Sequence, residues 1–135
     1  MHRNDWGGHR IWGPAINTST GANKYKTTSS EAIWTHSSFK GGPSLITMRY
    51  SSSNGSSMST NLIMRVNGKN LLSSGITGSL KSTNHPVAIG GTGNGGGTWQ
   101  GRISEFLIYN ADLGQNNIEK VEGYLAQKWG LSLEI

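Results

Sequence analysis

Residues 101–135, "GRISEFLIYNADLGQNNIEKVEGYLAQKWGLSLEI", differ from the rest of the chain, because a dense apolar run is followed by a break and a patterned helix. In the run, Ile103, Leu107 and Tyr109 alternate with Phe106 and Ile108, so apolar side chains fall on both faces of an extended strand. Such a pattern is typical of a strand that is buried on both faces. We therefore expect a double-covered strand here.

The residues after the break have the period of an amphipathic helix. The apolar stripe consists of Ile118, Val121, Leu125 and Trp129. The pattern predicts a helix over about residues 115–129, with Gly114 as a tolerable N-cap and Gly130 as the glycine that ends it. We expect this helix to cover the outer face of the strand, with Trp129 in the core.

The composition predicts an all-β domain. The chain has 135 residues, among them 20 glycines, 18 serines, 11 threonines and 12 asparagines, which favour turns and short strands. About six strand-like runs, each bounded by Gly, Pro, Asn or Ser, follow one another from Glu31 onward. There is no cysteine, so neither disulfides nor thiolate metal sites can hold this fold.

The strongest local turn signal is the run "LIMRVNGKNLL". Asn67 and Gly68 tolerate the positive φ that a two-residue type I′ hairpin demands. This turn predicts that Met64 lies opposite Leu71, and that Ile63 lies opposite Leu72.

Residues 1–30 have neither a strand period nor a helix period, and we expect an extended basic arm there. Its tryptophans are too apolar to stay in water, so they either pack on the chain's own sheets or are buried by a partner. The formal net charge is +5, and it is concentrated in the first 49 residues. The alternatives for this charge are an acidic protein surface, a nucleic acid, or a solvated arm; of the two partners we favour the protein. The candidate partner-binding residues are Arg3, Trp6, Arg10, Trp12, Lys24 and Lys26.

Three motifs in order, "VNGKNLLSSG", "VAIGGTGNGGGTWQGRISEFLIYNADL" and "NNIEKVEGYLAQKWGL", resemble the C-terminal half of concanavalin A-like, laminin G-like jelly-roll domains. The sequence is most similar to the variety found in bacteriophage structural proteins and bacterial surface proteins. The resemblance covers roughly residues 60–131. It implies a small jelly-roll β-sandwich over residues 31–135, closed by the C-terminal helix and preceded by the arm.

The resemblance also implies a function. We expect a non-enzymatic virion protein, such as a bacteriophage capsid decoration protein or another protein of the particle surface. Its partners would be the major capsid protein or other virion proteins, in a homo-oligomer or bound to the capsid lattice. The alternative is a carbohydrate-binding module, which would hold a host-surface glycan through Asn94, Trp99 and Gln100, although packing is the role that we favour for Trp99.

No motif for catalysis or for a cofactor is convincing. The glycine spacing of the dinucleotide-binding motif occurs at Gly91, Gly93 and Gly96. A strand-like run follows them, whereas the motif requires a helix at that place. Glu105 is the one acid that we expect to be buried, as a hydrogen-bonded structural carboxylate. The four histidines lack the spacing of metal ligands, so we expect no metal and no cofactor. Neither an export signal nor a membrane-spanning segment is expected.

Overall fold

The computed structural model describes residues 15–17, 22–26, 31–40, 42–50, 62–71, 89 and 101–134. The strands in these ranges are β1 (Ala15–Asn17), β2 (Ala22–Lys26), β3 (Glu31–Thr35), β4 (Ile46–Tyr50), β5 (Leu62–Val66) and β6 (Lys69–Leu71). A short 3₁₀ helix, η1 (Ser37–Lys40), follows β3, and one α-helix, α2 (Gly114–Trp129), lies near the C-terminus. The described residues therefore form a small β-rich domain with a C-terminal helix, as the sequence predicts.

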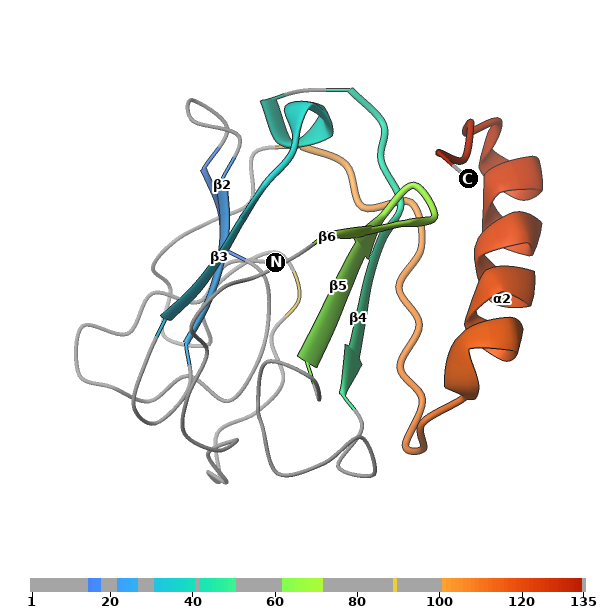
Figure 1. The fold of residues 1–135 in the computed structure, drawn as a ribbon. Coiled ribbons are helices and arrows are strands. Elements are labelled where there is room, and N and C mark those ends of the chain that lie inside the picture. The colour runs from blue at the N-terminus through green and yellow to red at the C-terminus, as the bar shows by residue number, and fades with distance from the viewer. Residues whose placement is uncertain are drawn as a thin grey trace.

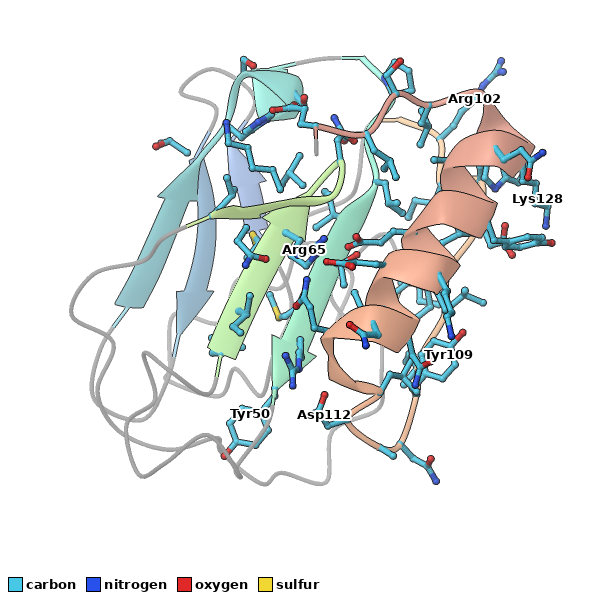
Figure 2. All side chains as sticks on the ribbon, turned by 45° about the vertical axis from the view of Figure 1, so that its right-hand side comes forward. Tyr50, Arg65, Arg102, Tyr109, Asp112 and Lys128 are labelled. Carbon is cyan, nitrogen blue, oxygen red and sulfur yellow. The ribbon has the colours of Figure 1, made fainter. Side chains whose placement is uncertain are left out.

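The strands form two antiparallel sheets of three strands, in the orders β1-β2-β3 and β4-β5-β6. In both views, the second sheet lies between the first sheet and α2 (Figure 1, Figure 2). The sheet β4-β5-β6 is therefore the layer that the helix covers.

The first sheet corrects the predicted boundary at residue 30. β1 and β2 both fall inside the predicted arm, and β2 pairs with β3 along its whole length, from Ala22 opposite Thr35 to Lys26 opposite Glu31. The run "ANKYK" has no apolar alternation, so its pairing with β3 left no signal in the sequence. Residues 1–14, which include both tryptophans of the arm, lie outside the described residues.

The hairpin β5–β6 confirms the turn prediction. Asn67 has φ 48° and Gly68 has φ 87°, and Val66 pairs with Lys69 across them. Met64 lies opposite Leu71, as the turn predicts. The predicted pairing of Ile63 with Leu72 falls outside the described residues.

Strand β5 is buried on both faces. Leu62, Met64 and Val66 are at most 2% exposed, and Arg65 between them is also buried. Because side chains alternate along a strand, Arg65 lies on the face opposite to that of these apolar residues. Figure 2 shows Arg65 between β5 and α2, so the apolar face of β5 is turned away from the helix.

Helix α2 begins at Gly114 and ends at Trp129, close to its predicted range. The backbone N–H of Gly114 donates to Asp112 Oδ1 at 3.0 Å, so Asp112 satisfies one of the free donors of the first turn. Gly130 adopts the left-handed conformation with φ 65°, and the N–H of Leu131 donates to the carbonyl of Ala126 at 2.8 Å. Gly130 therefore ends the helix as predicted.

The buried face of α2 differs from the predicted stripe. The buried residues are Ile118, Glu122, Leu125 and Ala126. Val121 is half-buried, and Trp129 is 44% exposed instead of lying in the core. The helix is rotated toward Glu122 because that carboxylate meets Arg65 of β5, a contact that apolar periodicity cannot show.

The prediction of a double-covered strand in residues 101–110 is wrong. These residues form an extended segment without regular secondary structure, which passes between β4 and α2 in the view of Figure 1. No backbone hydrogen bond joins residues 102–109 to another described residue. A strand needs a neighbour to complete its hydrogen bonds, and its apolar pattern does not supply one.

Candidate interaction surface

A buried ion pair fixes α2 on the second sheet. Arg65 Nε donates to Glu122 Oε1 at 2.9 Å, and Arg65 Nη2 donates to Glu122 Oε2 at 2.9 Å, which gives a bidentate pair. The two side chains are 4% and 2% exposed. A buried charge is costly to leave without its partner, so this pair specifies how the helix sits on the strand.

Further contacts hold the guanidinium of Arg65 in the hairpin. Its Nη1 donates to Asn70 Oδ1 at 2.6 Å, and its Nη2 donates to the carbonyl of Gly68. Four N–H bonds of the guanidinium are thereby used, two by the carboxylate and two by the hairpin itself. The fork is oriented by its own strand before the helix meets it.

The turn of the hairpin also binds two segments that are distant in the sequence, around Leu45 and Glu134. The side chain of Asn67 accepts from the N–H of Leu45 at 2.9 Å, and the N–H of Asn67 donates to the carbonyl of Leu45 at 2.9 Å. The N–H of Glu134 donates to the carbonyl of Asn67, so the residues after α2 return to the same turn. The carboxylate of Glu134 lies 3.2 Å from Nε2 of His36.

A second ion pair ties the start of α2 to β4. Arg49 Nε donates to Asp112 Oδ1 at 2.7 Å, and Arg49 Nη2 donates to Asp112 Oδ2 at 2.8 Å. The hydrogen bond that Arg49 donates to Asp112 raises the pKa of Arg49 above its usual value. Asp112 therefore binds Arg49 of β4 and accepts from the first backbone N–H of α2 at the same time, and Figure 2 shows it near the end of that strand.

These anchors leave a group of large apolar side chains in solvent, which we call the apolar patch. Its members, between 36% and 56% exposed, are Ile103, Phe106, Leu107, Ile108, Tyr109, Tyr124 and Trp129. Five of them lie in the extended segment and two on α2. Exposed large apolar side chains gathered in this way often mark sites of interaction.

Polar contacts at Glu105 join the two parts of the apolar patch. The indole Nε1 of Trp129 donates to Glu105 Oε2 at 2.8 Å, and Lys128 Nζ lies 3.1 Å from the same oxygen. The bond from Trp129, followed by that from Lys128, lowers the pKa of Glu105, and Glu105 in turn raises the pKa of Lys128. Glu105 is thus hydrogen-bonded as predicted, but it is only half-buried, and the buried acid among the described residues is Glu122.

The ammonium of Lys128 lies over two aromatic rings of the apolar patch. It is 5.6 Å from the ring centre of Tyr124 and 5.5 Å from that of Trp129. Both distances are in the range of cation–π interactions, which favour this arrangement of the two rings at the surface. Lys128 therefore contacts both of the aromatic residues that α2 contributes to the apolar patch.

The described residues do not test the residues predicted to bind a partner or a glycan. Lys24 and Lys26 lie on β2, of which the structure describes the backbone only. The remaining predicted residues lie outside the described ranges, namely Arg3, Trp6, Arg10, Trp12, Asn94, Trp99 and Gln100. The described ranges contain no group of three His, Asp or Glu residues that could hold a metal ion.

The apolar patch and the pair Arg65–Glu122 were both missed by sequence reasoning. A signal for the pair was present, because Glu122 stands among the apolar positions of α2 and Arg65 stands inside an apolar strand.

Comparison of the chain with models of protein families, with curated proteins and with solved structures finds no match. No helix in the described ranges is long and apolar enough to cross a membrane.

Proposed function

We propose that this protein is a non-enzymatic structural protein of a virus particle, of the kind that decorates the surface of a bacteriophage capsid. The apolar patch carries the proposal, because it offers exposed aromatic and aliphatic side chains to another protein. Aromatic residues are the side chains that supply most of the affinity at protein interfaces. The resemblance of the motifs around residues 60–131 to phage structural proteins gives the kind of assembly.

The proposed fold is a jelly-roll sandwich. Two observations support it: the two antiparallel sheets, and the apolar face that β5 turns away from α2. In a sandwich, the inner faces of two sheets form the core between them.

The charge of the chain supports a protein partner with an acidic surface. The formal net charge is +5, whereas the ion pairs of Arg49, Arg65 and Lys128 neutralise the cations near the apolar patch. The excess charge therefore belongs to other basic residues of the chain. It would speed the approach to an acidic capsid surface, and the apolar patch would supply the affinity.

The test is to look for the chain in purified particles. Virus particles from the source of the chain are purified on a density gradient, and the particle band is analysed by quantitative mass spectrometry. We expect this chain in the band in a fixed ratio to the major capsid protein. Its absence from particles whose other structural proteins are detected would contradict the proposal.

Glycan binding is the competing function, because the exposed indole of Trp129 beside Glu105 and Lys128 could also stack on a sugar ring. A glycan array with the purified chain separates the two functions. Binding that is lost in Trp129→Ala, by a chain that is absent from particles, would favour the carbohydrate-binding module.

A further inference from the structure

We infer that two copies of this chain pair through residues 102–109, as antiparallel strands related by a two-fold axis. The inference deepens the proposed function, because it names a second copy of the chain as a partner of the apolar patch. It begins from the backbone of the segment, which is extended and has no backbone hydrogen bond to another described residue. Such a backbone is a ready template for a further strand.

The side chains make pairing favourable. Five of the eight residues are large and apolar, and they are between 36% and 53% exposed in the single chain. Exposed segments of this composition either pair or aggregate. A contact between two copies related by a two-fold axis closes on itself, so the edge used for pairing is not left open to a third copy.

The sequence selects one register. A two-fold axis normal to the sheet keeps each face on its own side, so residues that lie opposite each other are both even-numbered or both odd-numbered. The apolar run 103–109 overlaps itself completely only when Phe106 lies opposite Phe106. Ile103 then lies opposite Tyr109, and Ser104 lies opposite Ile108.

Charge favours the same register. A shift by one residue along each strand toward the N-terminus would place Glu105 opposite Glu105, and like charges directly opposite each other are destabilising. In the register centred on Phe106, Glu105 lies opposite Leu107, while Arg102 lies opposite the amide of Asn110. Within each chain, the carboxylate of Glu105 already has Lys128 at 3.1 Å.

The apolar patch supplies a large part of the area that a dimer needs. The four aromatic side chains of the apolar patch are 36–56% exposed, and for side chains that bury 150–250 Å² each this leaves on the order of 400 Å² to cover. Ile103, Leu107 and Ile108 add to that area. A standard interface buries about 800 Å² on each partner, so the patch supplies a large part of one.

The absence of cysteine from the chain allows a sharp test. Opposite residues of antiparallel strands have Cα atoms about 4.5–5.5 Å apart, which is within the range of about 4.4–6.8 Å that a disulfide spans. The variant Phe106→Cys should therefore cross-link to a second copy in the presence of oxidised glutathione. The controls are Leu107→Cys, which is one residue out of register, and Gln127→Cys on the exposed side of α2.

At micromolar protein, paired thiols meet at an effective concentration in the millimolar range, so Phe106→Cys should cross-link roughly 100-fold faster than Gln127→Cys. Equal rates for these two variants would overturn the inference, and faster cross-linking of Leu107→Cys would overturn the register. The unmodified chain provides a measurement that does not depend on any variant. Its sedimentation should show a dimer that dissociates on dilution, and a monomer at all concentrations would overturn the pairing.

These measurements are independent of the test for the proposed function. A chain that dimerises but is absent from particles would refute the virion function and leave the pairing intact. A chain that is found in particles but is monomeric in solution, without a cross-link at Phe106, would refute the pairing and leave the virion function intact.

Discussion

The hairpin β5–β6 and the extended segment 102–109 have similar strand-like sequences but opposite environments. In the hairpin, Leu62, Met64 and Val66 are almost completely buried, and the charge of Arg65 is matched by Glu122. In the segment, Phe106, Leu107 and Ile108 are 36–53% exposed, and the backbone has no partner among the described residues. The difference shows that an apolar strand pattern specifies the need for a neighbour, whereas a turn or an ion pair specifies which neighbour it is.

The largest expected effect comes from breaking the ion pair between Arg65 of the hairpin and Glu122 of α2. Glu122→Gln leaves the guanidinium of Arg65 buried without a carboxylate, which should lower the free energy of unfolding by about 3–5 kcal/mol. Denaturant unfolding measures this loss. The matched control is Glu119→Gln, whose carboxylate is 52% exposed and 3.8 Å from Arg65, and it should cost less than about 1 kcal/mol.

A double variant tests the reason for this loss. Arg65→Met with Glu122→Leu removes both charges, so it should be less destabilising than Glu122→Gln alone. If Glu122→Gln costs no more than Glu119→Gln, the ion pair does not anchor the helix.

The next effect concerns the turn of the hairpin. Asn67→Ala removes the acceptor for the N–H of Leu45 and puts alanine at φ 48°, which together should cost about 2–4 kcal/mol. Asn67→Gly removes the same acceptor but tolerates the φ angle, so it should cost about 1–2 kcal/mol less. Equal losses in the two variants would show that backbone strain plays no part.

A smaller effect is expected at the apolar patch. Trp129 is 44% exposed, so Trp129→Ala should lower the free energy of unfolding by about 2 kcal/mol, below the 3–5 kcal/mol of a core tryptophan. Trp129→Phe keeps a ring but loses the bond to Glu105, and it should cost less than Trp129→Ala. A loss of about 4 kcal/mol or more in Trp129→Ala would mean that this ring belongs to the core, as its sequence pattern indicates.

The smallest effect is a dependence on pH. The bonds from Trp129 and Lys128 lower the pKa of Glu105 from 4.5, so the folded chain binds fewer protons there than the unfolded chain. The stability that Glu105 supplies is therefore complete above pH 4.5 and is lost as the pH falls through the lower folded value. We expect the difference in unfolding free energy between the natural chain and Glu105→Gln to shrink below pH 4.5. A difference that is constant across this range would contradict the lowered pKa.

The same contrast explains how much the sequence could predict. The turn at Asn67 and Gly68 and the end of α2 at Gly130 were predictable, because each depends on the φ angles of adjacent residues. The pair Arg65–Glu122 joins residues 57 positions apart, and only the presence of two charges among apolar positions indicated it. The sheet β1-β2-β3 and the exposure of residues 102–109 depend on which strands become neighbours, so no local pattern could predict them.

Amide hydrogen exchange tests the contrast between the two regions most directly. Amides of β5 should be protected nearly as strongly as global unfolding allows, at every protein concentration. Amides of residues 106–108 should exchange freely in dilute protein and gain protection as the concentration rises and two copies pair. Strong protection of residues 106–108 in dilute protein, equal to that of β5, would mean that the segment is paired within its own chain and would contradict the account.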